Sequence, residues 1–383
     1  MNQTPSGIYT QCPGGYTAFI PNPLPPKIEW SNQLINALSD ADRLLGRLAG
    51  EAGKLPNPHI FIRPFIMKEA VLSSRIEGTQ STLEEMLAKE AGAVVEQNID
   101  DMREVSNYVV ALEYGITRLD TLPLSLRLLR ELHEKLMEGV RGQHATPGEF
   151  RRSQNWIGPA GCTPTTATYV PPPLDHMLPC LDALEHFLHD RTLPPLIQIA
   201  LVHYQFEAIH PFLDGNGRVG RLLIILFLIE RRILPGPFLY LSAFFEASRQ
   251  DYYSGLLQVS KDGNWEHWLV YFLSGVARQS EDVLSRAERI NQLLSKWRSD
   301  TTGTSLPNQL IEHLAGNPFI MVKKVVETFH VAPATAQRAI DKLVKLEILI
   351  LEGEAKRNRV YCAKELLKIL EEPANVAAMV GDL

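Results

Sequence analysis

Residues 210–221 read HPFLDGNGRVGR and join two apolar segments, residues 196–209 and residues 222–233. Both flanking segments follow patterns that predict buried helices. Glycines allow a backbone to approach a ligand closely, and the N-terminus of a helix attracts anions. Arg218 and Arg221 are three positions apart, so both would lie on one face of the second helix and could hold one polyphosphate. The segment therefore predicts a phosphate site with an acid–base residue beside it.

The same letters allow two other interpretations. Gly215-x-Gly217-x-x-Gly220 satisfies the dinucleotide fingerprint, which needs a strand before it and an acidic residue about twenty positions later. Here the preceding segment has a helical pattern and Tyr240 occupies the twentieth position, so the context argues against a dinucleotide fold. A tight turn between two core helices, with solvated arginines and a core histidine, remains consistent with the residues alone.

The pattern H-P-F-x-D-G-N-G-R-x-x-R resembles the signature of the Fic (filamentation-induced) domain, and the chain matches it at every specified position. Fic domains are mostly helical and typically transfer AMP from ATP to a hydroxyl group of a target protein. The resemblance implies a mainly α fold, with a Fic-type helical core and a β-hairpin flap. It also implies a protein adenylyltransferase that acts on Ser, Thr or Tyr with ATP as its substrate.

The resemblance assigns a role to each residue of the motif. His210 would be the general base that takes the proton from the target hydroxyl, and Asp214 would hold Mg²⁺. Arg218 would meet the β-phosphate and Arg221 the γ-phosphate. A base with a pKa near the operating pH, together with Mg²⁺ and arginines against phosphate charge, is what such a transfer needs. The resemblance also implies that Gly215, Asn216, Gly217, Val219 and Gly220 contribute to ATP binding.

A helix that ends on a carboxylate lies upstream of the motif. The pattern predicts a helix over residues 65–77 that Gly78 stops, and a capping box at Ser81-Thr82-Leu83-Glu84 that starts the next helix. Glu77 then lies in the last turn, where the helix dipole disfavours a carboxylate. This misfit predicts a positively charged partner elsewhere in the chain.

Residues 73–78, SSRIEG, resemble the [ST]-x-x-x-E-[GN] inhibitory motif of Fic proteins. The resemblance implies that Glu77, with Ser73 at the start of the motif, pairs with Arg221 and keeps the γ-phosphate out. ATP would then bind only in an unproductive pose. Some members of the family also remove AMP, using the same glutamate to orient water, and this alternative stays open.

Two further segments resemble binding elements of the family. Residues 150–173 break helical periodicity and predict a hairpin or irregular flap, which in Fic proteins docks the main chain of the target by strand addition. The target-docking residues would be Thr168, Tyr169 and Val170, and the alternative is a long surface loop. Tyr252 and Tyr253 resemble the adenine-side wall, the alternative being one tyrosine in the core and one at the surface.

The chain divides into four predicted regions. Residues 1–27 are rich in Pro and Gly and predict an extended arm rather than a packed element. Residues 28–120 would form an N-terminal helical region with the inhibitory helix, and residues 121–297 the Fic catalytic core. The polar segment SDTTGTS, residues 299–305, separates a last domain over residues 306–375.

That last domain resembles a winged helix-turn-helix. Residues 308–314 and 321–329 predict two short helices, a third opens at residues 331–340, and two strands, 348–351 and 360–361, flank the basic tip Lys356-Arg357-Asn358-Arg359. Residues 318–364 carry nine Lys or Arg against five Asp or Glu, on a chain whose net charge is −6. This contrast predicts contact with DNA phosphates, with a protein-interaction or dimerisation module as the alternative. A recognition helix would present Thr335, Gln337, Arg338 and Lys342.

Length and composition limit the number of domains and the class of protein. The 383 residues allow two or three domains, and the net charge of −6 argues against a protein that coats nucleic acid throughout. The four cysteines are scattered, no signal peptide is apparent, and the longest apolar run, residues 222–229, is too short to span a bilayer. We therefore expect a cytoplasmic protein without membrane contact, and the family resemblance implies a homodimer. Two rival functions stay open: a Doc-like phosphotransferase, and a transcription regulator that uses the Fic core as a nucleotide sensor.

Overall fold

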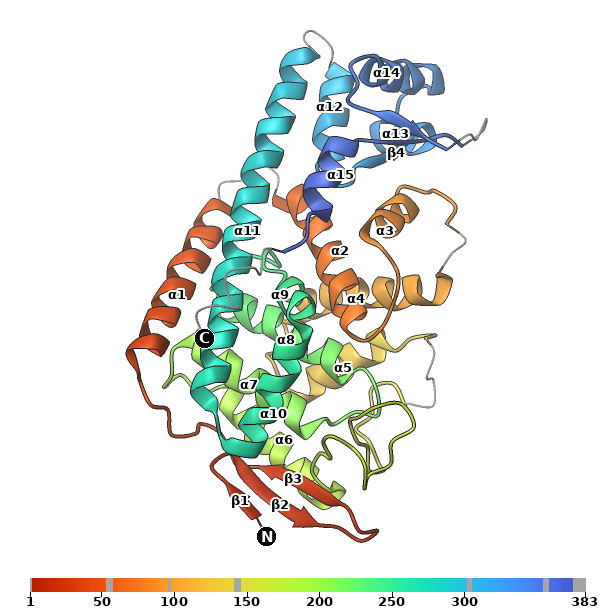
Figure 1. Ribbon diagram of the computed structural model, residues 1–383. Coiled ribbons are helices and arrows are strands. Elements are labelled where there is room, and N and C mark those ends of the chain that lie inside the picture. Colours follow the sequence, from red (N-terminus) through yellow and green to blue (C-terminus); the bar gives the residue numbers. More distant parts are fainter. Residues whose placement is uncertain are drawn as a thin grey trace.

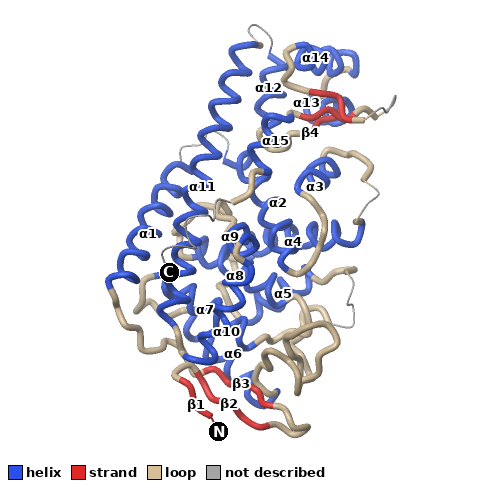
Figure 2. The backbone as a smooth tube through the Cα atoms, viewed as in Figure 1, coloured by secondary structure: helices blue, strands red, loops and turns tan. Residues whose placement is uncertain are grey.

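The computed structural model describes residues 2–52, 58–95, 98–140, 146–301, 305–353 and 358–374. Helices predominate in this part of the chain, as the sequence predicted, and the strands gather at two opposite ends of the molecule (Figure 2). Within the same ranges, no helix combines the length and the apolar character that a membrane span requires.

The N-terminal segment forms a small sheet, so the prediction of an extended arm over residues 1–27 was wrong. Three antiparallel strands pair in the order β1-β2-β3. The Gly and Pro residues that suggested an arm lie largely in the turns and the following loop, and Phe19 is buried among core residues. The backbone N–H of Phe19 also donates to the carbonyl of Val170 at 2.9 Å, which ties the sheet to the predicted flap. The strands are β1 (Asn2–Thr4), β2 (Gly7–Gln11) and β3 (Thr17–Pro21).

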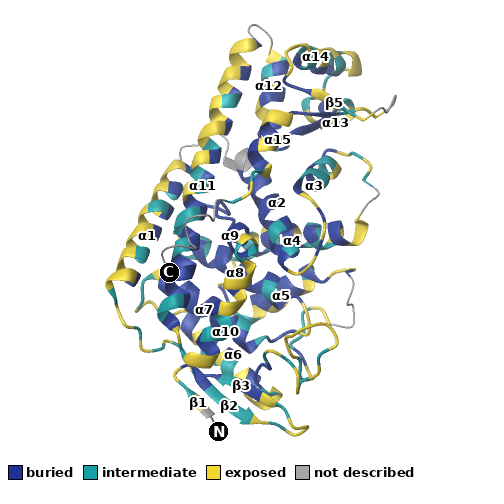
Figure 3. Cartoon of the chain, in the orientation of Figure 1, coloured by how far each residue is buried: buried dark blue, intermediate teal, exposed yellow. Residues whose placement is uncertain are grey.

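Two central helices are buried on nearly every side, α7 (Pro195–Ile209) and α8 (Asn216–Glu230). Apolar residues occur on all sides of both helices, as expected of helices at the centre of a protein, and the polar residues that they carry are mostly buried too. Figure 3 shows their buried surfaces inside a shell of other helices. The helices that contact them include α4 (Ile99–Arg118), α5 (Leu126–Leu136), α6 (Leu174–Leu188), α10 (Arg249–Asp262) and α11 (Trp265–Asp300).

A long pair of helices runs along one side of the molecule. Helix α1 (Asn32–Ala52) packs against α11, whose 36 residues give it a length of about 54 Å at 1.5 Å per residue. Figure 1 shows α11 continuing past α1 to the C-terminal elements, so that one rigid helix touches both ends of the fold.

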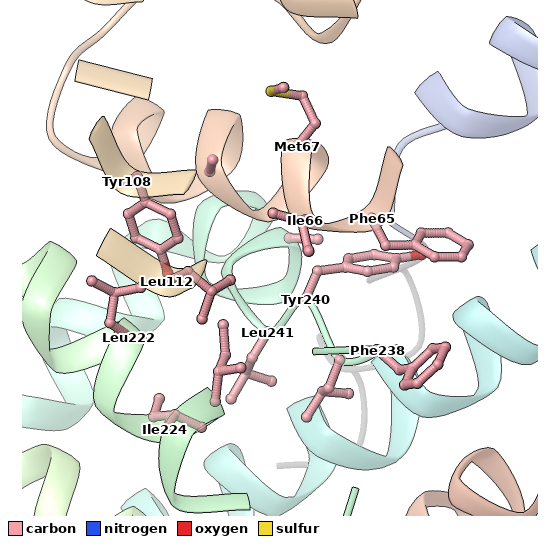
Figure 4. Packing of buried hydrophobic residues seen from close by; sticks show 14 of the residues in the cluster. Phe65, Ile66, Met67, Tyr108, Leu112, Leu222, Ile224, Phe238, Tyr240 and Leu241 are labelled. Atoms are coloured by element: carbon pink, nitrogen blue, oxygen red, sulfur yellow. The ribbon is translucent and has the colours of Figure 1, made fainter. Parts of the chain in front are cut away.

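Helix α2 (Pro58–Ile76) lies across α4 and the short helix α9 (Ser242–Ala247). Figure 4 shows its apolar side: the rings of Phe65 and Tyr240 stack with centroids 5.5 Å apart, and buried Tyr108 of α4 lies on the opposite side of the same cluster. Gly78, at φ +106°, ends the helix region because this backbone conformation strains other residues. The chain then enters α3 (Leu83–Glu90).

The capping box of α3 lies one position later than predicted. The side chain of Thr82, not Ser81, accepts from the backbone N–H of Glu85, and the carboxylate of Glu85 accepts from the N–H of Thr82. Two consecutive hydroxyl residues, each followed three positions later by a glutamate, gave the sequence two equivalent solutions.

The C-terminal elements form a second small unit beside α2, α3 and α11 (Figure 1). Its antiparallel sheet has the order β4-β6-β5. The first of these strands was not predicted: its last residue, Met321, was assigned to the following helix, and its other two residues to no element. Of the predicted basic tip, Lys356 and Arg357 lie outside the described residues. The elements are α12 (Ser305–Leu314), β4 (Phe319–Met321), α13 (Val322–Phe329), α14 (Pro333–Lys345), β5 (Ile350–Glu352), β6 (Val360–Cys362) and α15 (Lys364–Glu371).

Candidate active site

The predicted phosphate loop connects the two central helices. His210, at φ +48°, ends α7, and Gly215, at φ +76°, precedes α8. Helix α8 begins at Asn216, six residues before the apolar pattern predicted, so the glycines and arginines of the motif lie in its first two turns. Backbone N–H groups of a first turn have no partner within the helix, and the dipole adds positive character there. The loop therefore opens onto an anion site.

Hydrogen bonds within the loop fix its shape. The side-chain amide of Asn216 accepts from the N–H of Phe212 at 2.8 Å and donates to its carbonyl at 2.9 Å. Asn155 donates to the carbonyls of Phe212 and His210, at 2.8 Å and 3.2 Å, and buried Arg151 donates to the same His210 carbonyl at 3.1 Å. The Asn216 side chain thus shapes the loop, and the sequence missed Arg151 and Asn155 because their partners are backbone atoms.

His210 lies at the entrance of the loop in a form that can accept a proton. Burial lowers the pKa of its imidazole to about 4. The ring is therefore neutral at physiological pH, and a neutral imidazole is the protonation state that a general base needs.

Arg221 is the centre of a buried contact with α2, as the sequence predicted. Its side chain is 2% exposed, its Nε donates to Oγ of Ser73 at 2.8 Å, and its Nη2 donates to the Ser73 carbonyl at 2.9 Å. The same Nη2 donates to Oε1 of Glu77 at 2.6 Å. Burial alone would raise the pKa of the Glu77 carboxyl, but the charge and hydrogen bond of Arg221 outweigh it and hold that pKa below its ordinary value.

Gly217 leaves the space into which Glu77 reaches. A Cβ atom at this position would clash with Oε1 of Glu77 and crowd Nη1 of Arg221. The glycine thus permits the ion pair as well as close approach of a phosphate, and both would occupy the same side of the first turn. The side chain of Glu77 remains 33% exposed, so it can leave without opening the core.

A second carboxylate, which the sequence did not predict, lies behind Arg221. Burial raises the pKa of Glu207 to about 8, and its Oε1 has no hydrogen-bond partner among the described residues. A Cβ at Gly220 would clash with this oxygen, so the glycine is needed for the carboxyl to fit. Because Glu207 is mainly neutral at pH 7, Glu77 is the charged partner of Arg221.

Arg218 is held by Glu104 of α4, another residue that the motif does not include. The arginine is 3% exposed, and its Nη1 donates to Oε2 of Glu104 at 2.8 Å. Its Nη2 lies 3.6 Å from Oδ1 of Asp214. The guanidinium therefore joins α4 to the start of α8, and its role at the β-phosphate stays a prediction. Helix α4 is more than a hundred residues upstream, so no local signal could identify this partner.

Asp214 suits a site for Mg²⁺ that is completed by a nucleotide. Its side chain is 54% exposed, and its Oδ1 accepts from the N–H of Gly215 at 2.6 Å, which orients the carboxylate at the mouth of the loop. No group of three or more His, Cys, Asp or Glu side chains in the described ranges could hold a metal by itself. One carboxylate plus phosphate oxygens and waters is the usual arrangement for Mg²⁺, so the residues fit this ion.

Glu104→Gln is expected to destabilise the fold, since it leaves the buried Arg218 with the exposed Asp214, 3.6 Å away, as its remaining acidic partner. Breaking such a pair costs about 3–5 kcal/mol, and the retained amide oxygen reduces the expected loss to roughly 2 kcal/mol. Urea unfolding followed by circular dichroism measures it. Glu113→Gln, on the same helix but in a half-exposed pair with Arg63, should cost under about 1 kcal/mol. Equal losses in both variants would contradict a special role for Glu104.

Of the two tyrosines predicted to line the adenine side, one lies in the core and the other at the surface, as the alternative interpretation held. Tyr252 is buried, bonds to His203 at 2.8 Å and stacks within an aromatic cluster, so its face is not available to a base. Tyr253 is 42% exposed and lies beside the guanidinium of Arg249. Of the pair, Tyr253 alone remains a candidate for stacking on adenine.

The predicted flap is irregular and tied to the rest of the fold. Its backbone pairs once, between Ile157 and Tyr169, and the hydroxyl of Tyr169 donates to the Ala208 carbonyl at 2.7 Å. Thr168 is exposed, whereas Val170 is buried and its carbonyl accepts from Phe19 of β3. Strand addition by a target would therefore use the exposed part of this segment around Thr168.

Two parts of the sequence match known protein families. Residues 35–117 match the family described as "Fic/DOC family N-terminal", and residues 123–228, which include the loop, match "Fic/DOC family". The chain therefore carries a Fic domain, with the Fic N-terminal region directly before it. The Fic match contains the whole motif with Asp214 and Arg221, and the Fic_N match contains Glu77 and Glu104. Each of the two motif arginines, Arg218 and Arg221, lies in one matched region and is bound by a glutamate of the other.

Curated Fic relatives match part of this chain in sequence, and solved Fic structures share its fold. "Protein adenylyltransferase Fic" of Drosophila virilis is 32% identical over 153 residues, and that of Drosophila melanogaster 30% over 158 residues. These matches cover 38–39% of this chain but only 28–29% of the relatives' length. Among solved structures, a Fic family protein from Desulfovibrio desulfuricans G20 aligns over 89% of this chain and 98% of its own, with TM-score 0.60 and 20% identity. Fic-1 from C. elegans aligns over 67% and 74%, with TM-score 0.52 and 21% identity.

Proposed function

We propose that this protein is an autoinhibited protein adenylyltransferase, which transfers AMP from ATP to a hydroxyl side chain of a target protein and of its own chain. Curated relatives named protein adenylyltransferase Fic support the reaction. The observation that carries the proposal is the loop itself, where His210 lies beside a glycine-rich helix N-terminus whose arginine Arg221 is held by Glu77.

The chemistry follows from the residues at the loop. His210, neutral at physiological pH, takes the proton of the target hydroxyl. The hydroxyl oxygen forms a bond to the α-phosphorus, the bond from that phosphorus to the α,β-bridging oxygen breaks, and pyrophosphate leaves. The first-turn N–H groups of α8 and the two motif arginines stabilise the charge on the phosphates. Asp214 would hold Mg²⁺, which supplies positive charge against the leaving pyrophosphate.

Inhibition would act through competition for one guanidinium. Glu77 and the γ-phosphate of ATP are both anions that suit Arg221, and the space beside Gly217 accommodates one of them. While Glu77 occupies it, ATP would bind with its phosphates displaced from the position for in-line attack. Removal of AMP, with Glu77 orienting a water, is the alternative use of the same residue.

Labelled nucleotide separates this proposal from its rivals. Transfer of label from α-labelled ATP to protein supports adenylyl transfer, and transfer from γ-labelled ATP alone supports a Doc-like phosphotransferase. Binding of ATP without transfer of either label supports a nucleotide sensor. The proposal predicts α-label transfer by a variant that lacks the Glu77 carboxylate. Homodimerisation and a cytoplasmic location stay predictions.

We further propose that residues 305–374 form a winged helix-turn-helix that contacts DNA. The order helix, strand, helix, helix, strand, strand and the sheet β4-β6-β5 support this arrangement. Exposed Arg338 lies on α14, the third helix of the unit. The protein-interaction alternative is favoured if no DNA affinity is found.

DNA binding is tested by filter binding to duplex DNA over a salt series. The proposal predicts an affinity that falls as salt rises, because phosphate contacts release counterions. Arg338→Gln should weaken binding to all sequences and reduce the slope of log affinity against log salt by about 1. Absence of salt-dependent affinity in the full chain would contradict the proposal.

A further inference from the structure

The end of the last described helix lies in a basic socket that α2 helps to form. Nζ of Lys68, a buried residue of α2, donates to the carbonyls of Leu370 and Glu372, at 2.8 Å and 3.0 Å. Arg286 of α11 donates to the carbonyls of Ile369 and Glu372. The last carbonyls of a helix have no partner within it and carry the negative end of its dipole, so cations stabilise this end of α15.

A second set of contacts joins the C-terminal unit to α3. Nδ2 of Asn317, just before β4, donates to the carbonyl of Leu87 at 2.9 Å, and the asparagine is buried. Nζ of Lys364, at the start of α15, lies 3.1 Å from Oε1 of Glu84. Helix α3 also packs against β4 and α15. The C-terminal unit therefore contacts the chain on both sides of Glu77: at Lys68, nine residues before it, and at α3, which begins six residues after it.

Helix α2 connects the socket to the inhibitory contact. It is continuous from Pro58 to Ile76, so Lys68 and Ser73 lie on one rigid element that leads directly into Glu77. The same helix is also anchored to the Fic core, where buried Glu69 accepts from Tyr108 at 3.0 Å and from the backbone of Ser242 at 3.1 Å. The docked position of α2 thus depends on the C-terminal unit at Lys68 as well as on the Fic core, which it contacts through Glu69 and through the stack of Phe65 on Tyr240. Nζ of Lys68 itself also lies 5.2 Å from the centroid of the Tyr240 ring, so the variants below must separate its two contacts.

We propose that the C-terminal unit, residues 305–374, is a latch that holds the inhibitory segment against the active site. Lys68 is the positioning residue that transmits its hold to Glu77. The effect on enzyme activity rests on the function proposed above, whereas the contact of the C-terminal unit with α2 and α3 does not. Any partner that draws the C-terminal unit away from α2 and α3 would loosen the Glu77–Arg221 contact and activate the enzyme.

Lys68→Met in the full-length protein tests the latch, because methionine fills similar space but cannot donate to the two carbonyls. Two readouts are needed. Hydrogen exchange of the amides of residues 69–77 should quicken, and auto-transfer from α-labelled ATP should rise about tenfold, inside the range of roughly 5–150-fold typical for coupling between sites. Lys68→Arg, which keeps a donor, should restore slow exchange and low activity.

Two controls test whether Lys68 acts through α2 on the Glu77–Arg221 contact. Lys323→Gln removes an exposed cation of α13 whose ion pair, with Glu327, lies within the C-terminal unit, and it should change neither readout. In a Glu77→Gly background, Lys68→Met should add no further activity, since the contact on which the latch acts is already gone. An equal rise in that background would show that Lys68 acts on the core and would overturn the latch.

The outcomes separate the latch from the proposed function. Unchanged exchange of residues 69–77 in a folded Lys68→Met protein, verified by its circular dichroism and melting curve, overturns the latch whatever the enzyme activity. If Glu77→Gly transfers no AMP while Lys68→Met still quickens exchange, the latch stands and the adenylyltransferase proposal fails. If Lys68→Met does not fold, Asn317→Ala tests the same prediction from the α3 side.

Discussion

Glu77→Gly is expected to raise the rate of AMP incorporation by at least roughly 10²-fold, the lower end of the effect that one preorganised hydrogen-bond donor has on an oxyanionic transition state. The carboxylate engages Arg221 at 2.6 Å, and the space beside Gly217 accommodates either Glu77 or a phosphate. Its removal frees the buried guanidinium for the γ-phosphate and orients the α-phosphorus for attack. Autoradiography after incubation with α-labelled ATP measures the rate.

Glu77→Gln is the matched comparison for this variant. The amide oxygen can still accept from Arg221, but it carries no charge to compete with a phosphate, so we expect an intermediate rate. If glycine activates because it loosens the chain after α2, Gln will behave like the unmodified protein. Unchanged activity in both variants would reject inhibition through Glu77.

His210→Ala in the Glu77→Gly background is expected to abolish transfer, by a factor of about 10²–10⁴ for loss of a general base. ATP affinity, measured by calorimetry, should stay within a few-fold, since the helix N-terminus, Asp214 and the arginines remain. His176→Ala, on an exposed face of α6, serves as the control and should transfer normally. Retained transfer without His210 would remove it as the base.

The decrease of activity at low pH tests the role of His210 independently. Burial lowers the pKa of His210 to about 4, and the charge of Glu77 opposes this shift, so the Glu77→Gly variant should have a still lower value. In kcat/KM, which reports the free enzyme, activity of that variant should therefore hold from pH 8 to below pH 6. A midpoint at or above the ordinary imidazole pKa would show a different base or a different environment.

The sequence predicted those parts of the site that are coded locally. The loop and its helix N-terminus follow from a contiguous motif, and the Ser73–Glu77–Arg221 contact follows from two motifs that resemble one family. Glu104 and Glu207 escaped prediction because tertiary packing decides the environment of a buried carboxyl group, and such packing leaves no spacing signal in the chain.

The incorrect predictions of secondary structure have similar physical origins. Composition indicated an arm over residues 1–27, but Phe19 and its neighbours bury against the core, and tertiary contact decided the outcome. The capping box moved by one residue because two hydroxyl–glutamate pairs satisfied the same rule. Strand β4 pairs with β6, about forty residues later, so no local pattern marked it as a strand, and only its last residue, Met321, was assigned to an element, the helix that follows.

Intact-mass spectrometry of the Glu77→Gly protein after incubation with ATP and Mg²⁺ tests the central claim most directly. An autoinhibited adenylyltransferase will gain mass in steps of one adenylyl group, the unmodified protein will gain far less, and Glu77→Gly with His210→Ala will gain none. Gain of phosphoryl groups, or no gain in a folded Glu77→Gly protein that binds ATP, would contradict it.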